Sequence, residues 1–171
     1  MKSFVPFFVM CLLRIGVHAQ DTLKCNQDYL NDPLLEQMNG NWTGSGEVMG
    51  EKVGYRFSVQ WVLNHQFLEM DFRDTSANPA YVAKVSIGYN CDKKKYIIHW
   101  LDNFGAPYSE TLGYGIRKGD AIEMSFDYPD GKMINTFSFD SNNHTWTSHA
   151  VSLNKDGRWV SFANILMTPV R

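Results

Sequence analysis

Apolar and polar residues alternate along most of the chain after residue 50. In "VGYRFSVQW", Val53, Tyr55, Phe57, Val59 and Trp61 share one face, and polar side chains share the other. A repeat of two is typical of a β-strand with one buried face. The same alternation recurs in "YVAKVSIGY", "IEMSFDY" and "MINTFSF", where a single asparagine interrupts the apolar face of the last segment. The pattern therefore predicts strands that turn one face toward a core.

Turn-forming residues separate these runs at short and even spacings. Asp130-Gly131 and Asp156-Gly157 are typical of tight hairpins. No helical stretch lies between the runs, so an antiparallel meander is expected, and a sheet this long removes its edges by closing into a barrel. Runs and turns together predict about ten strands, near residues 41–49, 52–63, 66–73, 80–89, 95–102, 108–117, 121–128, 132–140, 144–153 and 158–168.

One short helix is expected before the first strand. Asp32 fits a helix N-cap, Pro33 fits the first helical position, and Gly40 can end the turn. The chain is therefore predicted to be all-β, a roughly ten-stranded antiparallel barrel with one short N-terminal helix, in a single domain.

The first residues differ from the rest and predict a signal peptide. "MKSFVPFFVMCLLRIGVHAQ" has a basic start, an apolar run that ends before Arg14, and small residues ahead of Gln20. The run is shorter than the roughly 20 residues that a membrane-spanning helix needs. We expect cleavage after residue 19 and a secreted or periplasmic domain over residues 20–171, without a membrane span. An uncleaved N-terminal anchor is the alternative.

Charge and cysteines narrow the classes of partner. The whole chain carries a formal charge of −2, which becomes −4 when Lys2 and Arg14 leave with residues 1–19. Nucleic-acid binding needs clustered cations, so this balance argues against it.

Cys25 and Cys91 remain after cleavage of the signal peptide. In an oxidising compartment they predict one disulfide, with two free thiols as the alternative.

Glycines and a tryptophan share a face of the first predicted strand. In "NGNWTGSG", residues 40, 42, 44 and 46 point the same way, so the strand can bend around Trp42. This segment resembles the glycine-X-tryptophan opening of lipocalin-like (calycin) barrels, and its extra glycines resemble nitrobindin-type haem barrels. With "FLEMDF", "IGYNCDKKKYIIHWLDNFG" and a final arginine, most of residues 34–171 resembles an uncharacterised bacterial family of lipocalin-like secreted domains. The resemblance implies that Trp42 packs beneath Arg171 and helps to close the barrel.

Catalytic and metal motifs are absent from the sequence. The chain has no Gly-X-Ser-X-Gly segment and no histidine pair at metal-ligand spacing. Glu69 and Asp71 share one strand face, which is interpreted as a solvated outer face. Nitrobindin-like haem binding would need a histidine late in the barrel. His149 is the nearest candidate, although its surroundings differ from that motif. No catalytic residue, metal ligand or cofactor is assigned.

The remaining hypothesis is a ligand inside the barrel. Inward aromatic side chains with a few phenolic hydroxyls suit a small apolar molecule with one or two polar groups. Two alternatives stay open: a haem barrel or a cavity acid–base enzyme that uses His99 or His149, and a structural or partner-binding domain with a filled core. The oligomeric state stays undetermined. The candidate lining residues are Tyr55, Phe57, Trp61, Tyr81, Tyr89, Met124, Phe126 and Tyr128.

Overall fold

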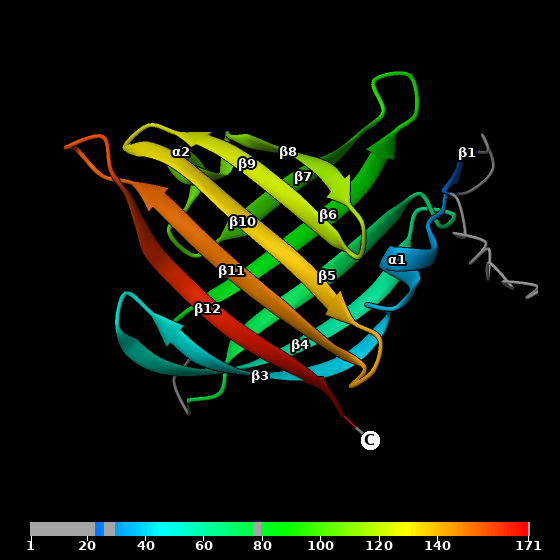
Figure 1. Cartoon of the computed structure of the whole chain (residues 1–171), viewed down its shortest axis with the longest axis horizontal. Coiled ribbons are helices and arrows are strands. Elements are labelled where there is room, and N and C mark those ends of the chain that lie inside the picture. Colours follow the sequence, from blue (N-terminus) through cyan, green and yellow to red (C-terminus); the bar gives the residue numbers. More distant parts are fainter. Residues whose placement is uncertain (1–22, 26–29, 77–79, 171) are drawn as a thin grey trace, which may run out of the picture.

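Ten antiparallel strands close into a barrel in the computed structural model, which describes residues 23–25, 30–76 and 80–170 (Figure 1). Each strand pairs with its neighbours in the sequence, and pairing of the last strand with the first barrel strand closes the ring. The predicted all-β meander is therefore confirmed. The barrel strands are β3 (Gly40–Val48), β4 (Glu51–Val62), β5 (Phe67–Asp74), β6 (Val82–Asn90), β7 (Lys95–Asp102), β8 (Leu112–Lys118), β9 (Ala121–Tyr128), β10 (Gly131–Asp140), β11 (Thr145–Leu153) and β12 (Trp159–Pro169).

Short elements lie outside the ring. β1 (Lys24–Cys25) and β2 (Leu30–Asn31) pair with each other, and β2 leads into helix α1 (Pro33–Glu36). The backbone N–H of Leu30 donates to the carbonyl of His65 over 3.0 Å, so the segment before α1 is tied to the β4–β5 turn. Residues 1–22 lie outside the described residues, and so does the predicted signal peptide. No helix in the described part of the chain is long and apolar enough to cross a membrane.

A second short helix, α2 (Ala106–Ser109), corrects the prediction of a single helix and of a strand beginning at residue 108. Gly105 adopts φ +92°, a conformation that suits glycine, and a proline follows at the start of the helix. β7 and β8 pair over only four residue pairs, from Tyr96 with Gly115 to His99 with Leu112. The sequence pattern missed α2 because one helical turn is too short to establish a helical repeat.

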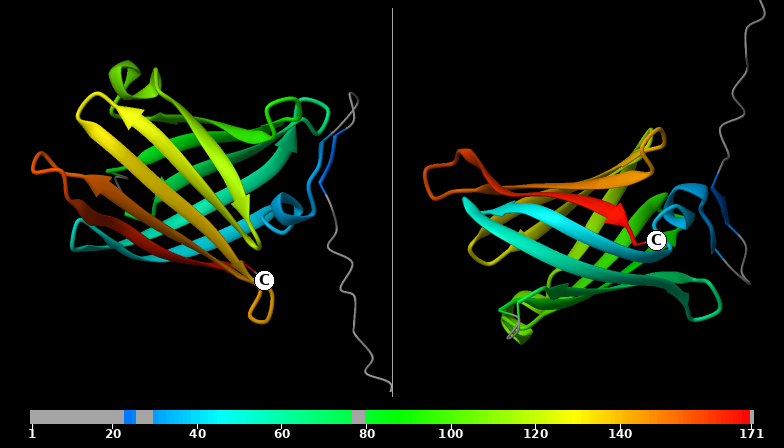
Figure 2. Two further views of the ribbon diagram at one scale, coloured as in Figure 1. Left: turned by 45° about the horizontal axis from the view of Figure 1, so that its top comes forward. Right: turned by 90° about the horizontal axis from the view of Figure 1, so that it is seen from below.

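The two ends of the barrel are different. α1 lies across one end, which we call the α1 end (Figures 1 and 2). Leu34, Leu35 and Met38 from this segment are buried in the core. The opposite end, which we call the open end, carries α2 and the turns that follow β3, β5, β9 and β11. Apolar burial of the helical segment therefore covers one end of the barrel and not the other.

Trp42 on β3 is buried, and glycines flank it along the same strand face. Its side chain is 3 % exposed, and its indole Nε1 donates to the carbonyl of Met38 over 2.7 Å. A Cβ built on Gly44 would lie 2.6 Å from the Phe57 ring, so this glycine is required by close packing. Arg171 lies outside the described residues, and the predicted contact between Trp42 and Arg171 stays a prediction.

The cysteine pairing also stays a prediction. Cys91 lies in the turn between β6 and β7, whereas the side chain of Cys25 on β1 lies outside the described residues.

Candidate functional site

The α1 end is sealed by a buried carboxylate. Asp32 is 1 % exposed, and its Oδ1 accepts hydrogen bonds from the backbone N–H groups of Leu34 at 3.0 Å and Leu35 at 3.3 Å. The Tyr96 hydroxyl on β7 donates to its Oδ2 over 2.6 Å, and Nη1 of Arg117 on β8 lies 3.5 Å from Oδ1. Burial, followed by the charge of Asp32, raises the pKa of Tyr96. These contacts fasten α1 to the barrel wall.

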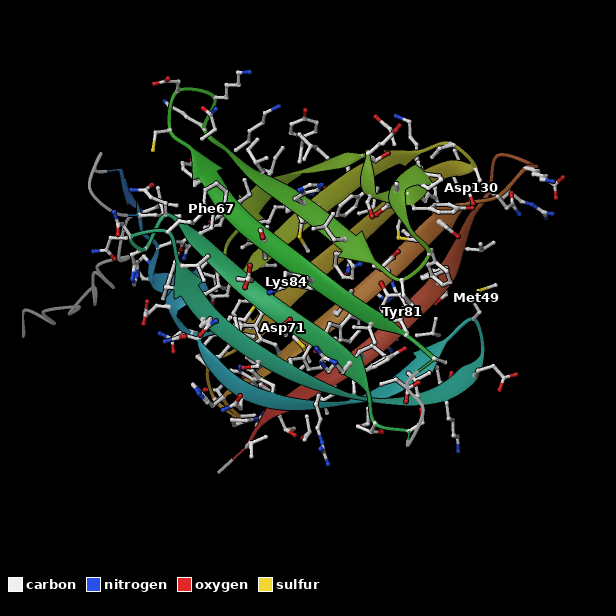
Figure 3. All side chains as sticks on the ribbon, turned by 180° about the vertical axis from the view of Figure 1, so that it is seen from behind. Met49, Phe67, Asp71, Tyr81, Lys84 and Asp130 are labelled. Carbon is white, nitrogen blue, oxygen red and sulfur yellow. The ribbon has the colours of Figure 1, made fainter. Side chains whose placement is uncertain are left out.

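Along β7, the inward side chains become more accessible toward the open end. Tyr96 and Ile98, near the α1 end of β7, are both 0 % exposed, whereas Trp100, further along the same face, is only half-buried. Tyr81 and Tyr128 at the open ends of their strands are half-buried as well. Figure 3 shows Tyr81 at this end of the barrel, with Met49 and Asp130. Trp100, Tyr81 and Tyr128 are therefore partly open to solvent at this end of the barrel.

A continuous set of rings lines this surface, and we call it the aromatic wall. Its members are Tyr55 on β4, Phe72 on β5, Trp100 on β7, and Phe126 and Tyr128 on β9. The ring of Phe72 lies 4.5 Å from that of Tyr55 and 6.2 Å from that of Trp100. Trp100 meets Phe126 edge-on at 6.2 Å, and Phe126 stacks on Tyr128 at 5.5 Å. Tyr55, Phe72 and Phe126 are buried, whereas Trp100 and Tyr128 are half-buried and are the rings that an apolar molecule could contact first.

A carboxylate lies beside the aromatic wall at the open end of the barrel, which we also call the mouth. Asp102, the last residue of β7, accepts a hydrogen bond from the Tyr81 hydroxyl at 3.2 Å and another from the backbone N–H of Phe104 at 3.0 Å. The indole Nε1 of Trp100 donates to the Tyr81 oxygen over 2.8 Å. Burial, with Asp102 adding a smaller effect, raises the pKa of Tyr128 to about 12 and also raises that of Tyr81. Both phenols are therefore neutral hydrogen-bond donors at neutral pH.

Three inward polar groups form no hydrogen bond to any residue that the structure describes. Asn135 on β10 is 6 % exposed, and its Oδ1 accepts a hydrogen bond from Oγ of Ser148 at 2.9 Å. Within the described part of the chain, its Nδ2 makes no hydrogen bond, and neither do the hydroxyls of Tyr55 and Tyr128. Every fully buried side-chain nitrogen or oxygen among the described residues has a partner. These three groups are therefore in contact with solvent and have capacity for a ligand.

A model of the family described as "Protein of unknown function (DUF1579)" matches residues 32–168. The chain belongs to this family. No curated protein sequence matches it.

Two solved structures share the fold of this DUF1579 chain. Rv2717c from M. tuberculosis superposes with a TM-score of 0.58 and 11% identity, covering 82% of this chain and 99% of the other. The S-type phycobiliprotein lyase CPES from Guillardia theta superposes with a TM-score of 0.53 and 13% identity, covering 80% of this chain and 89% of the other. At such identities the similarity shows a common barrel fold, in agreement with the lipocalin-like barrel expected from the sequence.

The DUF1579 barrel separates the eight sequence-predicted lining residues into groups. Tyr55, Tyr81, Phe126 and Tyr128 lie toward the open end. Phe57, which pairs with Trp42 and Phe72, and Met124 are buried between the two ends.

Trp61 and Tyr89 lie at the α1 end and are not brought together with the others. Trp61 donates from Nε1 to Oε2 of Glu36 over 2.7 Å and stacks on His65 at 4.0 Å. The ring of Tyr89 lies 5.0 Å from that of Tyr96. These two residues therefore support α1 rather than the aromatic wall.

Sequence reasoning missed Phe72, Trp100 and Asp102 as members of the site. Alternation along β7 puts Trp100 and Asp102 on the face opposite His99, but the sequence alone does not indicate which of the two faces is inside. Asn135 was noticed only as the single polar residue on an apolar strand face. That polarity is the sequence signal that could have indicated an inward polar group.

The polar residues considered for chemistry lie on the outer surface. His99 is exposed, with Nε2 3.0 Å from the carbonyl of Ser109, and His149 is exposed on β11. An acid–base role inside the barrel for either histidine is therefore wrong, and haem held from inside by His149 does not fit. No group of three His, Cys, Asp or Glu residues in the described ranges is arranged to hold a metal ion.

The paired carboxylates Glu69 and Asp71 lie on the outer face of β5, as expected. Lys84 Nζ lies 2.7 Å from Oε1 of Glu69 and 3.5 Å from Oδ1 of Asp71 (Figure 3). This exposed ion pair accounts for the two carboxylates as surface residues.

Proposed function

We propose that this DUF1579 protein is a secreted or periplasmic barrel that binds a small, mostly apolar molecule in its open half. The observation that carries the proposal is the set of three solvent-accessible polar groups, on Tyr55, Tyr128 and Asn135, within an aromatic inner surface. Each of these groups has hydrogen-bonding capacity that no partner among the described residues uses. A ligand with an apolar body and one or two polar atoms would contact the wall and satisfy these groups.

Other observations support the same assignment. The α1 end is closed by Asp32 and its partners, so the open end is the route by which a molecule would enter. The fold shared with a phycobiliprotein lyase supports a role exerted on another molecule rather than a purely structural one. The signal-peptide pattern of residues 1–19 supports the location.

Blocking the inner surface tests the proposal, with the neutral dye Nile red as probe. Ala150 on β11 faces inward and pairs with Asn135, whereas the adjacent His149 faces outward and is exposed. Ala150→Phe would place a ring beside the amide of Asn135. His149→Phe adds the same ring to the outside of the same strand. We expect the fluorescence titration to show dye binding by the wild type and His149→Phe, and at least tenfold weaker binding by Ala150→Phe.

A second inward variant keeps the test informative if Ala150→Phe does not fold. Ser152 pairs with Met133 nearer the open end and is half-buried, so Ser152→Phe blocks the same surface with less disturbance of the core. Thermal unfolding confirms that each variant is folded. Equal dye binding by folded inward and outward variants would refute the proposed site. No dye binding, together with a native mass equal to the denatured mass for protein purified from its own host, would refute ligand binding itself.

A further inference from the structure

Among the described residues, the carboxylate of Asp102 has no cation to pair with. It is half-buried, and within the described part of the chain no Lys, Arg or His nitrogen lies within ion-pair distance of it. Each of its oxygens accepts one hydrogen bond, from Tyr81 and from the backbone of Phe104. A carboxylate offers about four acceptor positions, so half of its capacity is left. A partly buried, unpaired charge is costly unless something compensates it.

Two positive side chains near the open end, Lys132 and Arg158, pair with carboxylates on the outer surface instead. Lys132 Nζ lies 3.1 Å from Oδ1 of Asp127, and Arg158 Nη2 lies 3.1 Å from Oδ2 of Asp156. All four of these side chains are largely exposed. The mouth of the barrel therefore receives no compensating charge from these neighbours.

Two further carboxylates increase the negative potential at the inner surface. Asp74 acts on Tyr55, and Asp130 acts on Tyr128, in each case raising the pKa of the phenol after the larger effect of burial. Among the described residues, neither Asp74 nor Asp130 forms an ion pair. A ligand carboxylate would be repelled at this place, whereas a cation would be attracted.

The rings around Asp102 suit a cation as well. Trp100 lies two residues before Asp102 on the same strand face, and Tyr81 bonds both residues. Phe104 packs against Tyr81 at 5.7 Å between ring centroids. Aromatic faces attract alkylammonium groups through their quadrupoles, and desolvation strengthens the attraction.

Resting on the proposed function, we propose that the ligand is an apolar amine. Its positively charged nitrogen pairs with Asp102 at the mouth, and its apolar body lies along the aromatic wall. The amide of Asn135 is more than nine-tenths buried, and its Nδ2 offers a hydrogen bond to an acceptor atom deeper in the molecule. The site thereby distinguishes amines from neutral and acidic molecules of the same shape.

Three probes with one ring system test the charge preference. They are naphthalen-2-ylmethylamine, naphthalen-2-ylmethanol and 2-naphthoate, titrated into the protein by calorimetry at pH 7 and low salt. We expect the amine to bind at least tenfold more tightly than the alcohol, and the naphthoate to bind most weakly, because a charge-assisted hydrogen bond is stronger than a neutral one.

Two variants, each of which removes one carboxylate, show whether the preference for the amine depends on Asp102. Asp102→Asn keeps the shape of the side chain at the mouth, and Asp127→Asn removes a carboxylate from the outer face of β9. We expect Asp102→Asn to abolish the preference for the amine while the alcohol still binds, and Asp127→Asn to keep the preference. Near-ultraviolet circular dichroism checks that both variants are folded.

Each outcome has a separate meaning. If the alcohol binds as tightly as the amine, or if Asp127→Asn loses the preference as fully as Asp102→Asn, the amine inference is overturned and the proposed function stands. If none of the three probes binds and Nile red does not bind either, the proposed function fails and the inference fails with it.

Discussion

Removing the Tyr96 hydroxyl tests the contact that joins α1 to the barrel. This hydroxyl donates to Asp32 over 2.6 Å, and both residues are at most 1 % exposed. Tyr96→Phe keeps the ring, so it leaves no large cavity. It removes one hydrogen bond to a buried charged group, for which the expected loss is about 1.5–3 kcal/mol of unfolding free energy. For a domain of this size, such a loss lowers the Tm by about 3–12 °C.

Urea unfolding followed by tryptophan fluorescence measures this loss. The denaturation midpoint should fall while the slope stays the same, since the surface exposed on unfolding does not change. Tyr89→Phe is the matched control, because the ring of Tyr89 touches Tyr96 but its hydroxyl makes no hydrogen bond within the described residues. We expect a change below about 0.5 kcal/mol for that variant. Equal losses for the two variants, or no loss for Tyr96→Phe, would refute the role assigned to the contact with Asp32.

Three further predictions concern pH, packing and the cysteines. The folded-state pKa of Tyr96 is raised above its unfolded value, so the contribution of this residue to stability is complete below about pH 10 and is lost above that pH. The free energy of unfolding should therefore fall less steeply with alkali in Tyr96→Phe than in the wild type. A Cβ on Gly113 would collide with the Phe126 ring, so Gly113→Ala should cost about 1–3 kcal/mol in urea unfolding, and adding Phe126→Leu should restore part of it. A bond between Cys25 and Cys91 would lower the intact mass by about 2 Da relative to the reduced protein, and its reduction should remove about 4 kcal/mol of stability; an unchanged mass would contradict the bond.

Much of the fold follows from the spacing of residues along the chain. Alternation in β4 and β9 identified the strands and the inward face of each, because successive side chains of a strand point to opposite sides. β8 shows the limit of this reasoning. Gly113 and Gly115 face inward, whereas Leu112, Tyr114 and Ile116 are exposed. Phe126, Ile122 and Tyr96 already fill the space inside, so the inward positions of β8 require glycine.

The candidate site was only partly accessible to sequence reasoning. Tyr55, Phe126 and Tyr128 were recognised as inward aromatic residues, and the structure places them in one wall. Trp61 shares a strand face with Tyr55 but lies at the opposite end of the barrel. An alternating pattern reports which way a side chain points and not how far along the barrel axis it lies. That height depends on strand register and tilt.

The sequence by itself determined that this chain forms an antiparallel barrel with an apolar interior, since local alternation and turn residues are properties of neighbouring positions. Only the tertiary structure decided that one end is sealed and the other is open. Asp32 and Tyr96 stand 64 positions apart, and Tyr81 and Asp102 stand 21 apart. Their contacts exist because the register of ten strands brings distant residues to the same height. The barrel therefore has two different ends that no local pattern could distinguish.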